Sequence, residues 1–276
     1  MKCWILSILL ILSTRGFGQL MLTSDSQENS HCNSNFCNYS GPTVILNEIM
    51  LAPSSFDGSL YGDGPGFGVD NNEGEWIELY NRDTCHPVDV SCYILGNNSV
   101  DVLDIDYFDY GGAYVLPSGT IIPPGGYVII RGPNSLSVPS NLLVQNGGNT
   151  IEIVISSNRV CLDGGARFWL PNAGGWLALY DATGTPVDAI SWASTYNACT
   201  YCNPCVPSGV GCSSITSLDS YDDILTSIKN YISNYDPMLF LGMSFRRIPD
   251  GGIWEEEPQY PTMGSCNEIY CNHSQG

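Results

Sequence analysis

Short apolar runs separated by turn-forming residues recur along most of this 276-residue chain. The runs are four to eight residues long and are bounded by glycine, proline, asparagine or aspartate, a pattern typical of strands rather than helices. With 30 glycines and 17 prolines available for tight turns, the chain is predicted to form an all-β sandwich or barrel. The expected strands are Thr43–Met50, Glu75–Asn81, Val88–Leu95, Ala113–Leu116, Gly126–Arg131, Thr150–Ile155 and Arg167–Leu170, followed by a hairpin of Trp176–Tyr180 with Pro186–Trp192.

The first residues have the pattern of an export signal. Lys2 gives a basic start, Cys3–Ser13 is apolar, and glycines flank the expected cleavage site. We therefore expect residues 1–18 to be a signal peptide and residues 19–41 to be a flexible leader. The mature protein, with 276 − 18 = 258 residues, is expected to be secreted or held at the cell surface.

The charge of the chain excludes some partners. The signal holds two basic residues and no acid, so nine basic residues become seven against 28 acidic ones, and the net charge goes from −19 to −21. Such a chain repels phosphate backbones, so we expect no nucleic-acid partner. No later window has eighteen consecutive apolar residues, so we expect no membrane insertion. The chain is 43% apolar, enough to bury a substantial core.

Eleven of the twelve cysteines follow the signal, and this number fits an oxidising compartment. Local pairs are possible within Cys32–Cys37, Cys85–Cys92 and Cys266–Cys271, and Cys161 could pair with the cluster Cys199–Cys212. The Cys-x-x-Cys-x-x-Cys spacing in that cluster could also hold zinc or an iron–sulfur cluster, but exported thiolates oxidise, which favours disulfides. The disulfide candidates are Cys32, Cys37, Cys85, Cys92, Cys161, Cys199, Cys202, Cys205, Cys212, Cys266 and Cys271.

One segment has helical periodicity. Apolar side chains follow each other at steps of three and four residues over Ser217–Tyr235, and this spacing predicts an amphipathic helix. Ser220 followed by Asp223 could cap its start, and Pro237 would prevent it from continuing.

Several short motifs occur in a defined order, and together they resemble the lamin-tail domain in the form found in secreted bacterial proteins. The resemblance covers roughly Pro42–Asn267. The motifs are Leu46-Asn-Glu-Ile49, Glu75-Trp-Ile-Glu-Leu-Tyr-Asn81, Pro87-Val-Asp-Val-Ser91, Gly119-Thr120, Pro123-Pro-Gly-Gly-Tyr-Val128, the hairpin Leu177–Asp188, and Ser244-Phe-Arg-Arg-Ile-Pro-Asp-Gly251 with Trp254.

The resemblance implies an immunoglobulin-like β-sandwich over residues 42–268, followed by a tail at 269–276. At the family's strand positions, Trp76 and Trp254 are expected to be largely buried. Two stretches depart from the family pattern. Residues 193–241, with the cysteine-rich loop and the expected helix, look like an insertion before the last strand, and residues 101–112 carry four aspartates.

Residues suited to catalysis are few. The chain has no Gly-x-Ser-x-Gly motif. Glu48, Glu75 and Glu78 are the best paired acids, but they coincide with strand motifs of the family, so structural hydrogen bonding explains them better. All three histidines look peripheral: His31, His86 and His273. We expect no catalytic residues.

The segment Asp57–Glu75 is rich in glycine and oxygen-bearing side chains, with the expected calcium ligands Asp63, Asp70, Asn72 and Glu73. Calcium takes six to eight oxygen ligands from flexible segments of this kind, although the order of an EF-hand is absent. Weak calcium binding is the sole cofactor expectation, and a solvated loop is the alternative.

Together these features predict an exported, non-catalytic binding or adhesion module, whose partner is an unidentified extracellular protein or glycan. Two alternatives remain open: a secreted hydrolase with its active site in the insertions, and a structural component of an extracellular matrix or surface layer. A concave pocket lined by acids and a histidine would favour the hydrolase, whereas a flat face rimmed by aromatic side chains would favour binding.

Overall fold

The main apolar core of this protein combines residues from strands at both ends of the described chain, from Val44 to Phe245. The computed structural model describes residues 40–51, 75–98, 111–132, 135–162, 170, 175–192, 199–206, 211–212, 215–233 and 242–267, all within the unit His31–Gly276. Several expectations lie outside these residues: the signal peptide 1–18, residues 19–39 of the leader, the tail 269–276, the calcium ligands Asp63, Asp70, Asn72 and Glu73, and Cys32, Cys37 and Cys271.

The regular elements are short strands joined by turns and single 3-10 turns. They are β1 (Val44–Met50), β2 (Trp76–Asn81), β3 (Val88–Asp89), β4 (Ile94–Asn98), β5 (Gly111–Val115), β6 (Ile121–Ile122), β7 (Tyr127–Arg131), η2 (Ser140–Leu142), η3 (Val144–Asn146), β8 (Thr150–Val154), η4 (Ser157–Arg159), β9 (Val160–Leu162), β10 (Gly175–Tyr180), β11 (Pro186–Trp192), η5 (Thr226–Ile228), β12 (Lys229–Ile232), β13 (Ser244–Ile248) and β14 (Ile253–Trp254). The described part of the chain thus has the all-β character that its turn-rich sequence predicts.

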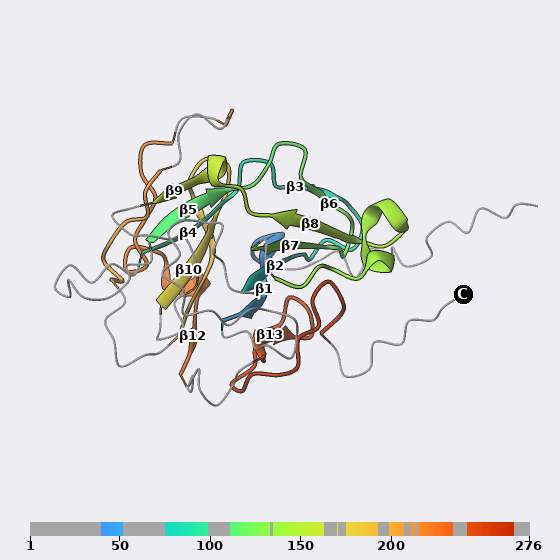
Figure 1. Cartoon of the computed structure of the whole chain (residues 1–276). Helices are drawn as coiled ribbons and strands as arrows, with labels where there is room; N and C mark the ends of the chain where they lie inside the picture. The colour runs from blue at the N-terminus through green and yellow to red at the C-terminus, as the bar shows by residue number, and fades with distance from the viewer. Residues whose placement is uncertain are drawn as a thin grey trace, which may run out of the picture. The chain divides into compact units, whose positions relative to one another are not determined.

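Two six-stranded sheets form the sandwich. Figure 1 shows β1, β2, β7 and β8 of one sheet, and β4, β5 and β9 of the other. Sheet 1 has the order β14-β13-β1-β2-β7-β8, and sheet 2 has the order β12-β11-β10-β4-β5-β9. Alternate side chains of both sheets meet in one apolar core, with Ile77 and Leu79 from sheet 1 and Leu177 and Leu179 from sheet 2. This confirms the immunoglobulin-like β-sandwich predicted from the sequence.

The outer face of sheet 2 is also buried. Trp176, Ala178 and Tyr180 of β10 point away from the inner core and pack with Leu218 and Ile224 of the insertion. Every residue of β10 is therefore buried, and the insertion forms a third layer over this sheet. The side chains of β10 are therefore apolar on both faces, because each face has an apolar cover.

The prediction of a helix over Ser217–Tyr235 is wrong. The segment forms a turn, the 3-10 turn η5 and the strand β12, which pairs in parallel with β11. The Ser220 hydroxyl and Asp223 bond to each other as a cap would, but the cap closes only one turn. The apolar residues at helical spacing serve different surfaces: Ile224 covers sheet 2, whereas the Leu225 side chain is exposed. Within the described residues, no helix has the length and hydropathy to span a membrane.

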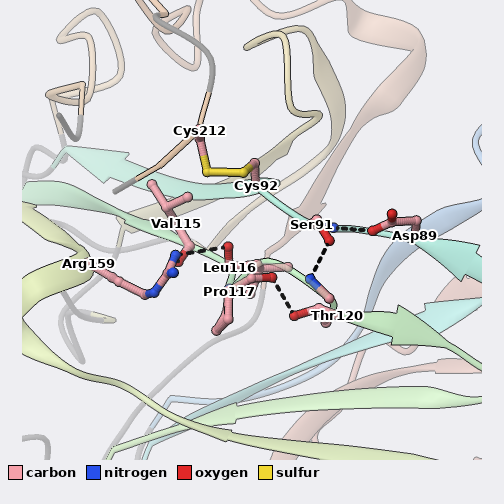
Figure 2. Close-up of a disulfide and its surroundings, with 10 residues drawn as sticks. Asp89, Ser91, Cys92, Val115, Leu116, Pro117, Thr120, Arg159 and Cys212 are labelled. Carbon is pink, nitrogen blue, oxygen red and sulfur yellow. Dashed lines mark hydrogen bonds between the residues drawn. A yellow bond between two sulfur atoms is a disulfide. The ribbon is translucent and has the colours of Figure 1, made fainter. Parts of the chain in front are cut away.

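Disulfides tie the insertion to sheet 2. Cys92, in the turn before β4, bonds to Cys212, and Cys161 of β9 bonds to Cys205. Figure 2 shows the first of these bonds beside the strand end that carries Val115 and Leu116. A third bond closes the short loop Cys199–Cys202.

The remaining described cysteines, Cys85 and Cys266, are also in disulfides. A local bond between Cys85 and Cys92 is not formed, because Cys92 is held by Cys212, 120 residues away in sequence. The same turn divides the expected strand Val88–Leu95 into β3 and β4, since Cys92 adopts a positive φ of 64°. Trp76 is buried as expected, and Trp254 is partly buried.

Candidate functional site

A bulge in β1 sets up the site. The pairing of β1 with β2 shifts between Leu46 and Glu48, so Asn47 is the additional residue. The backbone of Leu46 is bound by side chains: its N–H donates to the Asp188 carboxylate at 3.0 Å, and its carbonyl oxygen accepts from Arg247 Nε at 2.7 Å. The bulge therefore directs backbone polar groups toward a buried ion pair.

The ion pair joins the two sheets. Asp188 lies on β11 of sheet 2, Arg247 lies on β13 of sheet 1, and Arg247 Nη2 donates to the two carboxylate oxygens at 3.1 and 2.9 Å. Asn230 of β12 donates to Asp188 at 3.0 Å. Burial raises the pKa of Asp188, and the charge of Arg247 is the largest effect that lowers it. Because Nη2 bonds to both oxygens of Asp188 while Nε and Nη1 bond to backbone carbonyl oxygens, the Arg247 guanidinium is fixed in one orientation.

Asn47 holds the turn that follows β13. Its Oδ1 accepts from the Gly251 backbone N–H at 2.9 Å, and its Nδ2 donates to Asp250 at 2.7 Å and to Glu78 at 2.8 Å. Gly251 has a positive φ of 73°, a conformation that favours glycine. The turn is thus fixed from the bulge, and Arg247 Nη1 donates to its last residue, Gly252, at 2.8 Å.

Glu48 and Glu78 face each other across β1 and β2 on the outer face of sheet 1, and both are fully buried. Glu48 accepts from the Ser244 hydroxyl and from Thr262 N and Oγ1, the latter two at 3.0 and 2.5 Å. Glu78 accepts from the Gly264 N–H at 2.7 Å. Burial raises the pKa of Glu48 to about 7, and burial followed by the charge of Glu48 raises the pKa of Glu78 well above its usual range.

These acids serve the fold. Both carboxylates bind groups of the segment Thr262–Asn267 and hold it over sheet 1. The structural interpretation of the paired acids agrees with their hydrogen bonds. Glu75 is buried as well, and the exposed His86 bonds to Asp83 at 3.0 Å. His31 and His273 lie outside the described residues.

A cavity of about 380 Å³ lies where the sandwich meets the insertion. We call it the arginine pocket, and its polar and apolar walls include Arg82, Arg247, Asp188, Ser227, Ile228 and Asn230. Arg82 follows β2, Asp188 and Arg247 belong to the two sheets, and the other three come from η5 and β12 of the insertion. A further part of the pocket wall is formed by Ser40–Pro42, which precede β1.

Arg82 is held in the wall of this pocket by its surroundings. Its Nη1 donates to the carbonyl oxygens of Ser40 and Pro42 at 3.0 and 3.3 Å. A Cβ on Gly251 would lie 3.1 Å from Arg82 Cγ, so the absence of a side chain there leaves room for the arginine stem. The turn at Gly251 therefore positions both guanidinium groups.

Sequence reasoning missed this site. Asp188 and Arg247 lie within the quoted family motifs, but their contact across the two sheets has no local signal. The available signal was the scarcity of basic residues: Arg82 and Arg247 are two of only nine in the chain. Among the described residues, no group of three or more acidic, histidine or cysteine side chains could hold a metal ion.

Comparison with known proteins gives a family match. A family model described as Lamin Tail Domain matches residues 38–194. The curated proteins yield no match. Among solved structures, a DUF4876 family protein from Bacteroides thetaiotaomicron is similar, with a TM-score of 0.35 and 12% identity. That likeness covers 75% of this chain and 62% of the other chain.

Proposed function

We propose, from the premise that this chain belongs to the lamin-tail-domain family, that it is an exported, non-catalytic binding or adhesion module with the arginine pocket as its ligand site. The observation that carries this proposal is the position of the pocket. The sandwich supplies Arg82, Asp188 and Arg247, and the insertion supplies Ser227, Ile228 and Asn230. Ligand sites commonly lie where separate structural parts meet, and here the part particular to this chain completes the wall.

The non-catalytic part of the proposal is supported by the state of the acids. Glu48 and Glu78 are buried, and backbone and side-chain donors occupy their oxygens. Asp188, the acid in the pocket wall, is bound by Arg247, Asn230 and the Leu46 N–H. A carboxylate bound in this way is poorly placed to take a proton from a substrate.

Export is supported by the disulfides. All eight cysteines within the described residues are disulfide-bonded. Such bonds persist in oxidising compartments and are rare in the cytosol. We propose a secreted or cell-surface location, and a partner that is an extracellular protein or glycan.

The structural-component alternative is favoured by a different observation. Among the described residues of the insertion, three large side chains are exposed: Tyr201 at 69%, Leu225 at 71% and Tyr231 at 62%. Side chains of this kind could pack against neighbouring molecules in a matrix.

One experiment separates pocket binding from surface contact. Two variants on the same turn are compared: Ser227→Trp fills the pocket, and Leu225→Trp alters only the exposed surface. Each mature protein is applied to arrays of acidic and neutral saccharides and of peptides with free C-termini. We expect specific binding that Ser227→Trp abolishes and Leu225→Trp retains. Retained binding in Ser227→Trp would contradict the pocket as the ligand site.

A further inference from the structure

We infer that the arginine pocket binds one aromatic side chain of a partner protein, an inference that rests on the proposed function. The charged groups in the pocket wall are already bound within the protein, so they offer little to an ion. A guanidinium can still attract the face of an uncharged ring, and part of the remaining wall is aliphatic. An aromatic group therefore matches this wall better than an ionic one.

The hydrogen bonds of the charged groups are made inside the protein. Arg247 Nε and Nη1 donate to the carbonyl oxygens of Leu46 and Gly252, and Nη2 donates to both oxygens of Asp188. Arg82 Nη1 donates to two backbone carbonyl oxygens. A charged ligand would lose its hydration on entering the cavity without gaining a matching partner there, which costs free energy.

The Arg247 guanidinium can meet a ligand on one side. The nitrogens at its edge are bound, and Cζ lies over the Trp254 ring, 5.0 Å from the ring centroid. These contacts leave the side of the guanidinium opposite Trp254, and the aliphatic stem, to border the cavity. Guanidinium groups attract aromatic rings through their faces, and Trp254 already makes such a contact. A ring in the pocket would place Arg247 between two aromatic groups.

The rest of the wall suits the edges of a ring. Val187 of the sandwich and Ile228 of the insertion supply aliphatic surface. Val187 packs against the inner core, and Ile228 packs against the outer cluster of sheet 2, so a ring between them would join two apolar clusters that are already formed. The cavity of about 380 Å³ is near the lower limit of ligand pockets, and it has room for one large side chain rather than an extended chain.

The rim of the pocket favours a side chain over a free small molecule. Three residues of the wall, Ser40, Gly41 and Ser227, are exposed and form this rim. The main chain of a partner would stay in water there while its ring is buried. Protein interfaces commonly concentrate their binding free energy in a few anchor side chains that fill pockets, and aromatic residues are enriched among them. The hydrogen bonds of the wall are made before a partner binds, which lowers the entropic cost of binding.

The test uses the mature protein and blocked tripeptides, acetyl-Gly-X-Gly-amide, in which X is phenylalanine, tyrosine, cyclohexylalanine or glutamate. Cyclohexylalanine resembles phenylalanine in size and apolar area but has no aromatic face, so it isolates the contact with the guanidinium. Chemical-shift titration measures the Kd values. We expect saturable binding of the phenylalanine and tyrosine peptides, about threefold weaker binding of the cyclohexylalanine peptide, and at least about tenfold weaker binding of the glutamate peptide. Raising salt from about 20 mM to about 500 mM should leave the phenylalanine Kd within about twofold, since the ligand has no charge to screen.

Ring-current shifts locate the bound ring. An aromatic ring in the pocket shifts the methyl resonances of Val187 and Ile228, whereas the exposed Ile253, outside the pocket wall, is the control. We expect these shifts with the phenylalanine peptide and their loss in Ser227→Trp, in which a ring of the chain itself fills the cavity. Leu225→Trp, at an exposed position on the same turn, should retain binding. Melting temperatures of both variants confirm that each is folded.

Four outcomes would overturn the inference. A lack of saturation by the phenylalanine peptide would remove the ligand class. Equal Kd values for the phenylalanine and cyclohexylalanine peptides would show that no aromatic face is recognised. Binding of p-cresol as tight as that of the tyrosine peptide would assign the pocket to free aromatic molecules. Binding of a saccharide in place of every peptide, abolished by Ser227→Trp, would reject the aromatic side chain and leave the proposed binding function intact.

Discussion

The two sheets are covered on their outer faces by segments held in different ways. Sheet 2 is covered by the insertion, which packs apolar side chains such as Leu218 and Ile224 on it and is bound through Cys92–Cys212 and Cys161–Cys205. Sheet 1 is covered in part by Thr262–Asn267, which is held by hydrogen bonds to the buried acids. Both covers include apolar contacts and disulfide-bonded cysteines, since Met263 packs against Met50 and Trp76 and Cys266 is in a disulfide. The cover of sheet 1 differs in that it also binds two buried carboxyl groups that titrate.

The comparison predicts that the two covers respond differently to pH. Reduction breaks the bonds of the insertion to sheet 2 and also the disulfide of Cys266, whereas a rise in pH should weaken only the segment over sheet 1. The arginine pocket lies beside the insertion and is built partly from its residues, so redox conditions should affect ligand binding more than pH does.

The largest expected effect is on the covalent cover. Replacing Cys92 and Cys212 by alanine opens a loop of 120 residues, and we expect a loss of about 4 to 5 kcal/mol from the free energy of unfolding, because long loops gain the most entropy in the unfolded chain. The matched control replaces Cys199 and Cys202, three residues apart, where about 2 kcal/mol is expected. Urea denaturation measures both. Equal losses would show that loop length does not decide the strength of this cover.

The ion pair that links the sheets should have the next largest effect. Arg247→Met removes the cation and leaves Asp188 buried with its charge uncompensated, so we expect a loss of about 3 to 5 kcal/mol. Replacing both residues, as Arg247→Met with Asp188→Asn, should recover part of this loss. Thermal unfolding of the two variants and the parent measures the coupling. A double variant that is less stable than Arg247→Met alone would contradict the uncompensated charge as the cause.

The cover of sheet 1 should respond to pH through Glu48. Its pKa is raised from 4.5 to about 7 by burial, while hydrogen bonds from Ser244 and Thr262 and the charge of Arg246 act in the opposite direction. Glu78 faces it across the strands, and Asp250 lies nearby on the turn. The folded state therefore keeps a proton that the unfolded chain releases. The stability from this group is fully present below about pH 4.5 and is lost as the pH rises through about 7.

The expected loss of stability across this window is about 3 kcal/mol, because the pKa of Glu48 rises from 4.5 to about 7 on folding. Glu48→Gln should reduce the slope, because the amide stays neutral and can still bond to Thr262. Burial also raises the pKa of Glu78, which accounts for the slope that remains. Glu256→Gln, at an exposed position, is the matched control and should leave the slope unchanged. Urea denaturation at intervals from pH 4 to 8 measures the slope, and hydrogen exchange at Gly264 reports whether the segment opens locally. A slope in Glu48→Gln equal to the parent's would reject Glu48 as the titrating group.

The sequence predicted the two sheets better than their covers. Strands such as β2 were predictable because Ile77 and Leu79 alternate with polar or aromatic neighbours, and this period is local. The insertion was not predictable in the same way. Its apolar residues have helical spacing, yet Ile224 packs on sheet 2 and Leu225 faces solvent, and tertiary packing overrode the local period.

The pocket was beyond sequence reasoning for a similar reason. Arg82, Asp188, Ser227 and Arg247 are far apart along the chain and meet only through the sheet order. The bulge at Asn47, which directs the Leu46 backbone toward the ion pair, has no sequence signature apart from the family motif. Long-range strand pairing and a backbone bulge therefore define the site, and the spacing of apolar residues in the sequence predicts neither of them.

The smallest expected effect concerns calcium. We propose that the segment Asp57–Glu75 binds calcium weakly through Asp63, Asp70, Asn72 and Glu73, since a net charge of −19 favours a divalent cation among crowded acids. With a Kd of about 1 mM, 2 mM calcium would add less than about 1 kcal/mol to stability. Sodium at matched ionic strength controls for screening. Asp63→Asn with Asp70→Asn should abolish the calcium-specific rise in melting temperature and leave the responses to reduction and pH unchanged. Equal stabilisation by calcium and sodium would mean that screening alone acts, and that the acids of this segment are solvated.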